Sequence, residues 1–410
     1  MRLLVYEHVS GGGFADEAIP VSVLSEGFGM LRTLVSDFKT AGHYVTITLD
    51  SRIAKLNPPI DADCVVPVFS SQIALANLRK NSDSADATYV IAPETNGLLR
   101  SLVGIVEQTG AASLNCQADA IEKVSDKVFL HNFMKKLGLP LPETMMFSVA
   151  NDLKEIKKAV RGNLNFPAIF KPSDGVSCCG LSTVSNEEQV DGAIEKIKRE
   201  SSSKHFLVQE LIGGDATSVS LLATGSKAVP ISLNRQDVTI ETPEACSSYN
   251  GGIVPFDNPL GAEAFEAAEK LVKSVSGFRG YIGVDFVLTE EAAVAIEVNP
   301  RLTTSYVGLT RVVNFNPAQA IVNAVLHSEL PTRIQSCGCT YFSKVETANQ
   351  NVDAFQKTCK IDEVISPPFP ISENSAASAL ISSYGATLKE AKSRFREAKK
   401  RVLTTINRGM

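Results

Sequence analysis

The chain has 410 residues, of which 44% are hydrophobic and 21% are charged, a balance typical of globular proteins. At about 100–200 residues per domain, this length allows two to four domains or subdomains. The formal net charge of -5 gives no electrostatic reason to expect a nucleic acid or an anionic membrane as partner. No stretch approaches the roughly 20 apolar residues of a membrane span, and the start does not resemble a signal peptide, so we expect a cytoplasmic protein.

The eight cysteines and five histidines do not form a metal-binding pattern. No C-x-x-C pair occurs, and Cys337 and Cys339 have no histidine nearby. Zinc is therefore weakly supported, and reduced thiols in a reducing compartment are the favoured interpretation.

Apolar strands alternate with amphipathic helices at the start of the chain. The expected strands are 2–7, 43–49, 63–69 and 88–93, and the expected helices are 21–42, 72–80 and 96–110. This alternation predicts an open α/β domain with a mostly parallel sheet, which we expect to span residues 1–116.

Two helices and two strand-rich units follow. The helices are expected at 118–126 and 127–138, and the smaller α+β unit at about 145–205 has strands at 145–149, 166–172 and 181–184. The larger unit is expected to hold a helix at 262–276 and strands at 205–211, 218–224, 229–233, 281–288 and 294–298. Residues 331–410 contain a proline-rich bend and a final basic helix, so the expected domains are 1–116, 117–330 and 331–410.

Polar side chains alternate with apolar ones along the strand-like segment 294–302, VAIEVNPRL. Because successive side chains of a strand point to opposite faces, the apolar set is expected in a core and the polar set on the other side. The apolar set is Val294, Ile296 and Val298, and the polar set is Glu297, Asn299 and Arg301. A solvated face is the ordinary reason for such alternation.

A hairpin with the preceding strand brings a second carboxylate to the polar face. A turn centred on Glu291 places Asp285 opposite Glu297, and such neighbours lie about 4.5–5.5 Å apart at Cβ. Two carboxylates this close repel unless a cation lies between them. Oxygen ligands suit Mg²⁺ or Mn²⁺, so Asp285, Glu297 and Asn299 are candidate metal ligands, and Arg301 is a candidate donor to a phosphate. A surface Asp–Arg pair is the open alternative.

A loop of small residues follows Lys171 at the end of an apolar strand. Backbone N–H groups of such a loop can surround phosphate oxygens, and the lysine supplies a positive charge. It is not a Walker A loop, because no G-K-[ST] opens a helix, and a plain turn is the alternative. Lys127, which begins a predicted helix, is a second candidate phosphate contact.

The segment FLVQELIGGD, residues 206–215, has the features of a hinge. Its exposed backbone groups could bind the edge of an adenine while Leu211 and Ile212 pack against the faces of the ring. An ordinary strand end is the alternative.

The order of these elements resembles the ATP-grasp superfamily of carboxylate–amine ligases. The resemblance covers about residues 1–330. It implies an α/β protein with the ATP-grasp fold, an N-terminal pre-ATP-grasp domain, a small α+β lid and a C-terminal antiparallel-sheet subdomain. It also implies ATP and Mg²⁺, or Mn²⁺, as cofactors.

The resemblance implies a role for each candidate residue. The expected ATP contacts are Lys127, Lys171, Ser173, Asp174, Gly175, Gly180, Gln209, Glu210, Leu211, Ile212 and Asp215. The expected metal ligands are Asp285, Glu297 and Asn299, and the expected catalytic residues are Arg301 and Lys171. Ala216 occupies the position of the ribose-binding acid of many members, so neighbouring Asp215 is expected to replace that acid.

Five further segments resemble the tyramine–glutamate ligases, which act in methanofuran-type cofactor synthesis. They are VYEHVSGGG, SVLSEGFGMLRTLVSDF, IAPETNGLL, SDK and NPRLTTSYVGL. This resemblance implies that the enzyme joins the carboxylate of an amino acid, glutamate, to an amine, which is tyramine or a related molecule. The reaction is expected to pass through an acylphosphate. Segments 302–311 and 10–13 are the candidates for holding these substrates, with ordinary polar loops as the open alternative. A homodimer is compatible with the pattern.

Two rival functions stay open. One is another amino-acid or dipeptide ligase of the same fold, and the other is a protein that binds ATP without catalysis. Cys178 and Cys179 lie in the glycine loop, and we predict that they take no part in the chemistry.

Overall fold

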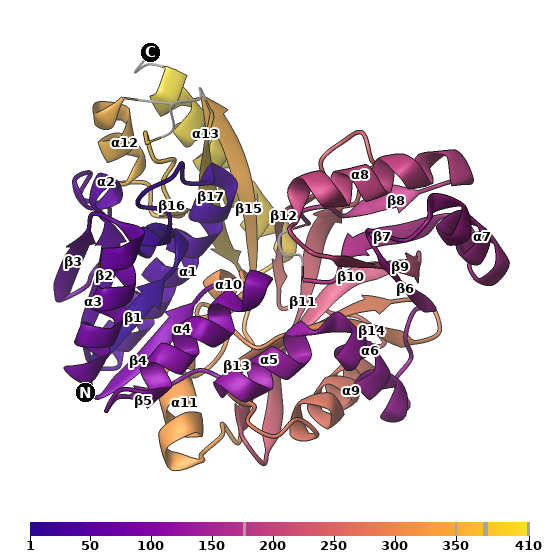
Figure 1. Cartoon of the computed structure of the whole chain (residues 1–410). Coiled ribbons are helices and arrows are strands. Elements are labelled where there is room, and N and C mark those ends of the chain that lie inside the picture. The colour runs from indigo at the N-terminus through magenta and orange to yellow at the C-terminus, as the bar shows by residue number, and fades with distance from the viewer. Residues whose placement is uncertain (175–177, 349–350, 372–375, 408–410) are drawn as a thin grey trace.

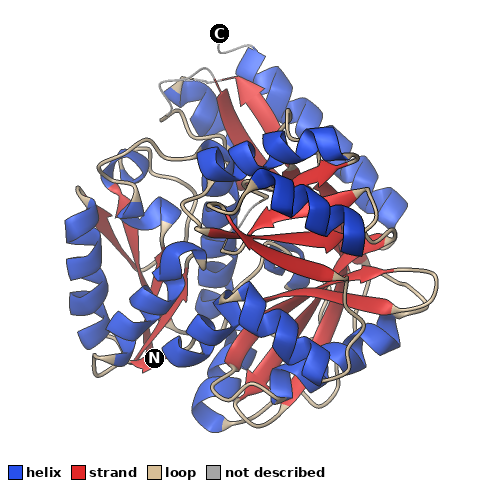
Figure 2. Cartoon of the chain, turned by 45° about the vertical axis from the view of Figure 1, so that its right-hand side comes forward, coloured by secondary structure: helices blue, strands red, loops and turns tan. Residues whose placement is uncertain are grey.

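The structure is a computed structural model that describes residues 1–174, 178–348, 351–371 and 376–407. Within these residues the strands form three sheets, and helices cover their faces (Figures 1 and 2). No helix of these described ranges has the length and apolar character that crossing a lipid bilayer requires.

The N-terminal sheet is parallel, in the order β3-β2-β1-β4-β5, which confirms the predicted open α/β unit. Its strands are β1 (Arg2–Glu7), β2 (Tyr44–Asp50), β3 (Cys64–Val68), β4 (Ala87–Ile91) and β5 (Ala112–Ser113). Its helical segments are η1 (Val9–Gly13), α1 (Val21–Thr40), α2 (Ser51–Ala54), α3 (Ser71–Asp83), η2 (Thr95–Gly97) and α4 (Leu98–Glu107). Because the strand order reverses between β1 and β4, their carboxyl ends border a crevice suited to a ligand.

The second sheet is antiparallel, in the order β6-β9-β7-β8, and forms the small unit at the right of Figure 1. Its strands are β6 (Thr144–Ser148), β7 (Ala168–Pro172), β8 (Ser182–Val184) and β9 (His205–Glu210), and its helices are α7 (Leu153–Asn163), η3 (Glu187–Gln189) and α8 (Val190–Glu200). Placing strand 205–211 in the larger unit was wrong, because β9 pairs with both β6 and β7. Apolar strand composition does not reveal which partner a strand chooses.

The third sheet is antiparallel and has the order β14-β13-β10-β11-β12-β15-β17-β16. Its strands are β10 (Asp215–Thr224), β11 (Ala228–Thr239), β12 (Ser248–Val254), β13 (Arg279–Leu288), β14 (Ala293–Asn299), β15 (Cys339–Ala348), β16 (Val364–Ser366) and β17 (Ala376–Gly385). The last three strands continue this sheet, so the end of the chain packs directly onto the middle. Strands β12, β15, β16 and β17 were not predicted, because polar and glycine residues weaken the apolar pattern of β12, β15 and β17 and because β16 has only three residues.

The remaining helices cover the third sheet or join it to the first. They are α5 (Ala118–Ser125), α6 (Lys127–Lys136), α9 (Gly261–Lys273), α10 (Tyr306–Leu309), α11 (Pro317–Val322), η4 (Asn323–His327), α12 (Val352–Thr358) and α13 (Leu388–Asn407). The basic helix α13 buries Phe395, Val402 and Ile406 in a local core with Val345 and Ile381. The helix therefore packs against the third sheet through its apolar face.

A β-bulge changes the predicted faces of β14. Asp285 pairs with Glu297 as expected, but the next residue, Phe286, pairs with Ala295, so Ile296 has no cross-strand partner. Ala295 therefore takes the core position. The expectation that Ile296 packs in the core was wrong, because an extra residue in one strand reverses the alternation beyond it.

Candidate active site

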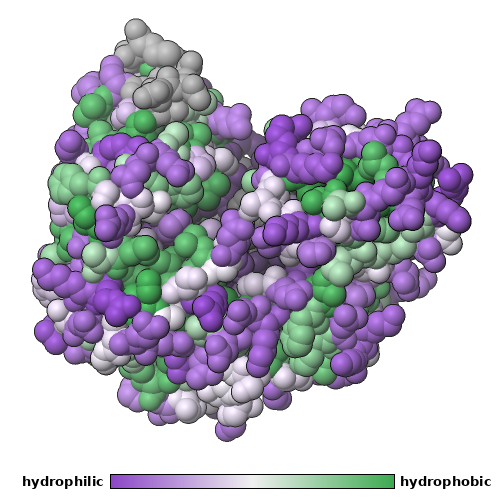
Figure 3. Space-filling view, viewed as in Figure 1, coloured by the Kyte–Doolittle hydropathy of each residue, from purple (hydrophilic) through white to green (hydrophobic). Residues whose placement is uncertain are grey.

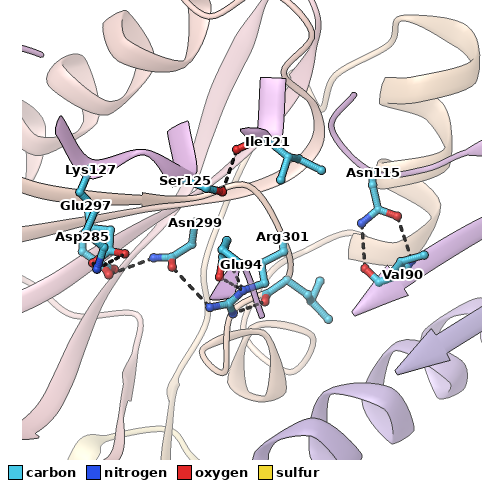
Figure 4. Close-up of polar contacts among 11 residues, drawn as sticks. Val90, Glu94, Asn115, Ile121, Ser125, Lys127, Asp285, Glu297, Asn299 and Arg301 are labelled. Carbon is cyan, nitrogen blue, oxygen red and sulfur yellow. Dashed lines mark hydrogen bonds and ion pairs between the residues drawn. The ribbon is translucent and has the colours of Figure 1, made fainter. Parts of the chain in front are cut away.

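Two carboxylates face each other at the edge of the third sheet. Asp285 on β13 and Glu297 on β14 are direct cross-strand partners. Asn299 Nδ2 donates to Asp285 Oδ2 at 2.9 Å (Figure 4), and Gln236 Nε2 on β11 donates to Asp285 Oδ1 at 3.1 Å. Three strands thus hold one carboxylate in a fixed orientation.

The electrostatics of this pair favour a bound cation. Burial, followed by the charge of Glu297, raises the pKa of Asp285 to about 7. Burial also acts to raise the pKa of Glu297, but Lys127 and Lys171 together lower it. A divalent cation would relieve the repulsion, and Asp285, Glu297 and Asn299 offer the oxygen ligands that Mg²⁺ prefers.

Two lysines approach the same carboxylates. Lys127 is the first residue of α6, whose N-cap Asp126 accepts from the backbone N–H of Val128 and Phe129, and Lys127 Nζ lies 3.2 Å from Glu297 Oε1. Lys171 on β7 is only 8% exposed, and burial followed by the charge of Lys127 lowers its pKa to about 8. Two buried cations that repel each other make a site suited to a polyphosphate.

The guanidinium of Arg301 is held by an acid from the N-terminal sheet (Figure 4). Arg301 Nε donates to Glu94 Oε1 at 2.9 Å and to Glu94 Oε2 at 3.0 Å, and Nη1 donates to the Leu302 carbonyl at 3.1 Å. Both charged side chains are largely buried. Glu94 was not predicted as a site residue, because it follows β4 in a segment without any periodic pattern.

A cavity of about 710 Å³ opens beside these groups. The space-filling view is hollowed between the lobe that carries the C-terminus and the small unit (Figure 3). Charged and amide residues described above line this cavity, and they are Lys127, Lys171, Gln236, Asp285, Glu297, Asn299 and Arg301. A second part of the cavity wall comes from segments that follow β1 and β4 and from α1 and α4, and its apolar residues are Val9, Phe14, Val23, Met30 and Leu98.

From the predicted phosphate loop, Cys178 and Cys179 line this cavity, whereas the predicted contacts Ser173, Asp174 and Gly180 do not. Ser173 Oγ is 2.8 Å from Ser203 Oγ, and the backbone N–H of Gly180 donates to Glu200 Oε2 at 3.0 Å. Gly180 has φ +69°, a conformation that favours glycine. Asp174 Oδ1 is buried without a hydrogen-bond partner among the described residues, and Gly175 lies outside those residues.

Cys178 and Cys179, in the same loop, line the cavity. Burial raises the pKa of Cys178 to about 11, and burial also raises the pKa of Cys179. Because the thiolate is the nucleophilic form of cysteine, both side chains are poorly reactive at neutral pH. This chemistry favours the prediction that neither takes part in the reaction.

Of the predicted adenine-binding residues, Gln209 faces a pocket. It lines a small second pocket together with Lys127, Lys171 and Ile296. Leu211 is 38% exposed and lines neither cavity. The bulge explains why the sequence analysis missed Ile296 as a pocket residue.

The other three predicted contacts lie near the connection from β9 to β10. Glu210 accepts a hydrogen bond from the backbone N–H of Glu143 at 3.4 Å, and Asp215 lies 3.7 Å from Arg235 in an exposed ion pair. Ile212 is partly buried and lines neither cavity. A ligand contact by these residues stays a prediction.

The two segments predicted to hold substrates border the cavity differently. From segment 302–311, Thr303, Thr304 and Ser305 line it. The glycine segment 10–13 does not line it, although the preceding residues Glu7, His8 and Val9 do. Ser10 instead donates its backbone N–H to the buried Glu7 carboxylate at 2.6 Å and thereby supports that wall.

Comparison with known proteins agrees with this geometry. Residues 124–305 match the ATP-grasp domain family, and residues 43–121 match the pre ATP-grasp 3 domain family. Tyramine–L-glutamate ligase of Methanocaldococcus fervens is 28% identical over 310 residues, which cover 75% of this chain and 89% of that protein. Tyramine–L-glutamate ligase of Methanocaldococcus jannaschii is 27% identical over 338 residues, or 81% and 92% of the two chains.

Solved structures share the whole fold. L-amino acid ligase from Bacillus licheniformis has a TM-score of 0.68 at 14% identity and covers 98% of this chain and 97% of its own. The biotin carboxylase domain of Hydrogenobacter thermophilus 2-oxoglutarate carboxylase, solved with MgADP and bicarbonate, also has a TM-score of 0.68 at 14% identity. This match spans 97% of the present chain and 89% of the biotin carboxylase chain.

The two facing carboxylates, the two lysines and the preceding parallel sheet define an ATP-grasp fold, with an ATP-grasp domain at residues 124–305 and a pre-ATP-grasp domain at residues 43–121. The chain is an ATP-dependent carboxylate–amine ligase. It is a relative of the tyramine–L-glutamate ligases.

Proposed function

We propose that this ligase joins the carboxylate of glutamate to the amine of tyramine or a related aryl amine. The observation that carries the proposal is a single cavity with an ionic end and an apolar wall. Asp285, Glu297, Lys127, Lys171 and Arg301 form the ionic end. The names of the two relatives supply the substrates, and the cavity is compatible with both.

The ionic end suits ATP. Lys127 and Lys171 neutralise charge on the phosphate chain, and Asp285, Glu297 and Asn299 would hold Mg²⁺. When bound, this ion neutralises and aligns the β- and γ-phosphates. Arg301, fixed by Glu94, stabilises charge on the phosphoryl group as it is transferred. The small pocket beside Gln209 and Ile296 is the proposed adenine site; its volume of about 10 Å³ requires the small unit to move outward before the ring can enter.

The proposed reaction has two steps. A carboxylate oxygen of the amino acid bonds to the γ-phosphorus of ATP while the bond from that phosphorus to the bridging oxygen breaks, so ADP leaves. The neutral amine then bonds to the acyl carbon of this acylphosphate, the bond from carbon to the phosphate oxygen breaks, and phosphate and a proton leave. Water would hydrolyse the intermediate, so the small unit is proposed to close over it.

The apolar wall suits the body of an aryl amine. Val9, Phe14, Val23, Met30 and Leu98 line it, and they belong to the N-terminal part of the chain. Pockets for drug-sized molecules are commonly apolar with a few polar groups that fix orientation. An amine whose ring packs here can present its nitrogen toward the ionic end of the cavity.

Release of ADP tests the proposal. With ATP and Mg²⁺, the protein is expected to release many equivalents of ADP per molecule only when both L-glutamate and tyramine are present, and mass spectrometry is expected to detect the amide. Turnover with two amino acids but not with tyramine would favour the dipeptide-ligase alternative. ATP binding without turnover under any pairing would favour the non-catalytic alternative.

A further inference from the structure

A buried ion pair on the cavity wall has no part in the chemistry proposed so far. Glu26 on α1 and Lys344 on β15 join the N-terminal helix to a strand from the last part of the chain. Glu26 Oε1 lies 2.8 Å from Lys344 Nζ, and their side chains are 11% and 12% exposed. Isolated buried ion pairs contribute little to stability, because desolvation offsets the attraction.

The neighbours of Glu26 hold its carboxylate firmly. Thr304 Oγ1 donates to Glu26 Oε2 at 2.9 Å. Lys344 Nζ also donates to Ser22 Oγ at 2.9 Å and lies 5.9 Å from the centre of the Tyr249 ring. Glu26, Thr304 and Tyr249 line the cavity, whereas Lys344 lies behind Glu26. The carboxylate is therefore the member of this ion pair that borders the cavity, and Lys344 and Thr304 fix its orientation.

Glu26 lies within electrostatic reach of the ionic end of the cavity. Glu26 and Asp285 both raise the pKa of Tyr249, in addition to the larger effect of burial. Burial and Glu26 likewise raise the pKa of Cys178, which also responds to Glu297. A small molecule with a positive group on Glu26 and a carboxylate beside the metal ligands would therefore span one end of the cavity.

The chemistry of the two substrates decides which positive group belongs there. A carboxylate stabilises an ammonium and raises its pKa, which would oppose attack by an amine that must be neutral. The ammonium of the amino acid takes no part in the reaction and can stay charged throughout. A carboxylate has about four acceptor positions, so Glu26 can accept from an ammonium in addition to Lys344 and Thr304.

We infer that Glu26 binds the α-ammonium group of the amino-acid substrate, with Lys344 and Thr304 as positioning residues for its carboxylate. The inference rests on the proposed function and names the group by which that cavity distinguishes an amino acid from a simple carboxylic acid. The C-terminal strands thereby contribute to substrate selection through Lys344.

Discrimination between L-glutamate and glutarate, which lacks the ammonium, tests the inference. The wild type is expected to show a higher kcat/KM for L-glutamate than for glutarate. Glu26→Gln is expected to reduce this preference about 10- to 100-fold, the range for a lost hydrogen bond to a charged group, while glutarate turnover persists. Persistent glutarate turnover also shows that the variant is folded. An unchanged preference would overturn the inference and leave the proposed function standing.

Two further variants separate recognition from a structural role. Thr304→Val is expected to lower the preference for L-glutamate over glutarate by a smaller factor than Glu26→Gln. It replaces Glu26→Gln as the test if that variant does not fold. Lys39→Met breaks a pair between the same helix and Asp63, 2.5 Å apart and outside the cavity, and it is expected to leave the preference unchanged. An equal loss in Lys39→Met would show that general loosening of α1 accounts for the effect, which contradicts the inference.

If the wild type turns over neither acid, the proposed function fails and binding decides the inference. Calorimetric titration of L-glutamate and glutarate into protein saturated with MgADP then gives the preference directly. Tighter binding of L-glutamate that Glu26→Gln abolishes supports the ammonium site, and equal binding of both acids overturns it.

Discussion

Glu94 and Arg301 are 207 residues apart in the chain, and Arg301 Nε donates to both carboxylate oxygens of Glu94. Glu94 comes from the carboxyl end of β4, whereas Arg301 follows β14. Glu94 does not line the cavity, so it lies behind the guanidinium and orients it from outside. The N-terminal sheet thus completes the ionic end of the cavity as well as its apolar wall.

Loss of the Glu94 carboxylate is expected to misplace Arg301. Glu94→Gln removes a charge-assisted contact, so kcat is expected to fall by about 10-fold or more while KM for ATP changes little. Steady-state ADP release measures both constants. Glu107→Gln, which weakens the 4.0 Å pair with Arg279 outside the cavity, is the matched control and is expected to keep kcat. Equal kcat in Glu94→Gln and wild type would contradict the positioning role.

Removing one carboxylate of the facing pair is expected to weaken nucleotide binding without lowering the stability of the protein. Asp285→Asn relieves repulsion from Glu297, so the melting temperature of the protein without ligands is expected to stay equal or rise. The increase in melting temperature on adding MgADP is expected to shrink strongly, because a ligand stabilises only as far as it binds. Differential scanning calorimetry checks this. An undiminished increase would show that Asp285 does not hold the metal.

Ile296 is expected to contribute to nucleotide affinity. Ile296→Ala removes apolar surface from the small pocket shared with Gln209, so KM for ATP is expected to rise about 5- to 20-fold, with little change in kcat. Val294→Ala is the neighbouring control, since Val294 lines neither cavity. A larger rise in the control would argue against the proposed adenine site.

The two loop cysteines are expected to be dispensable. The double variant Cys178→Ser/Cys179→Ser is expected to release ADP at the wild-type rate, because the raised pKa of each thiol keeps it protonated at neutral pH. Rapid-quench measurement of the first turnover examines the chemical step directly. A selective loss of that step in the double variant would assign a catalytic role to the loop thiols.

Asp37 is expected to make stability depend on pH. Burial raises its pKa to about 6, although Tyr306 and Thr310 donate to its carboxylate. Because the pKa is higher in the folded than in the unfolded state, the stabilisation that Asp37 provides is complete below about pH 4 and is lost as pH rises through 6.

The variant Asp37→Asn isolates this contribution. Relative to the variant, the free energy of unfolding of the wild type is expected to fall by up to about 3 kcal/mol between pH 4 and pH 7. Denaturant unfolding of both proteins at several pH values gives the difference. A difference that stays constant with pH would show that Asp37 keeps an ordinary pKa in the folded protein.

The pairing of Asp285 with Glu297 was predictable because it is local. The spacing predicted the correct pair, although the turn lies between Glu290 and Glu291, because the bulge shifts the register by one residue and compensates for the misplaced turn centre. The parallel N-terminal sheet was predictable for a similar reason, since alternating strands and helices admit few topologies. The bulge that turns Ile296 into the pocket was not predictable, because one unpaired residue leaves no trace in the composition.

By itself, the sequence determined which short segments carry carboxylates, lysines and small residues, because strand alternation, helix caps and loop composition act between near neighbours in the chain. Only the tertiary structure decided that Glu94 orients Arg301, that Lys344 stands behind Glu26, and that β9 belongs to the small sheet. These contacts join segments from distant parts of the chain. Their partners are selected by the packing of whole sheets against one another, which no local pattern encodes.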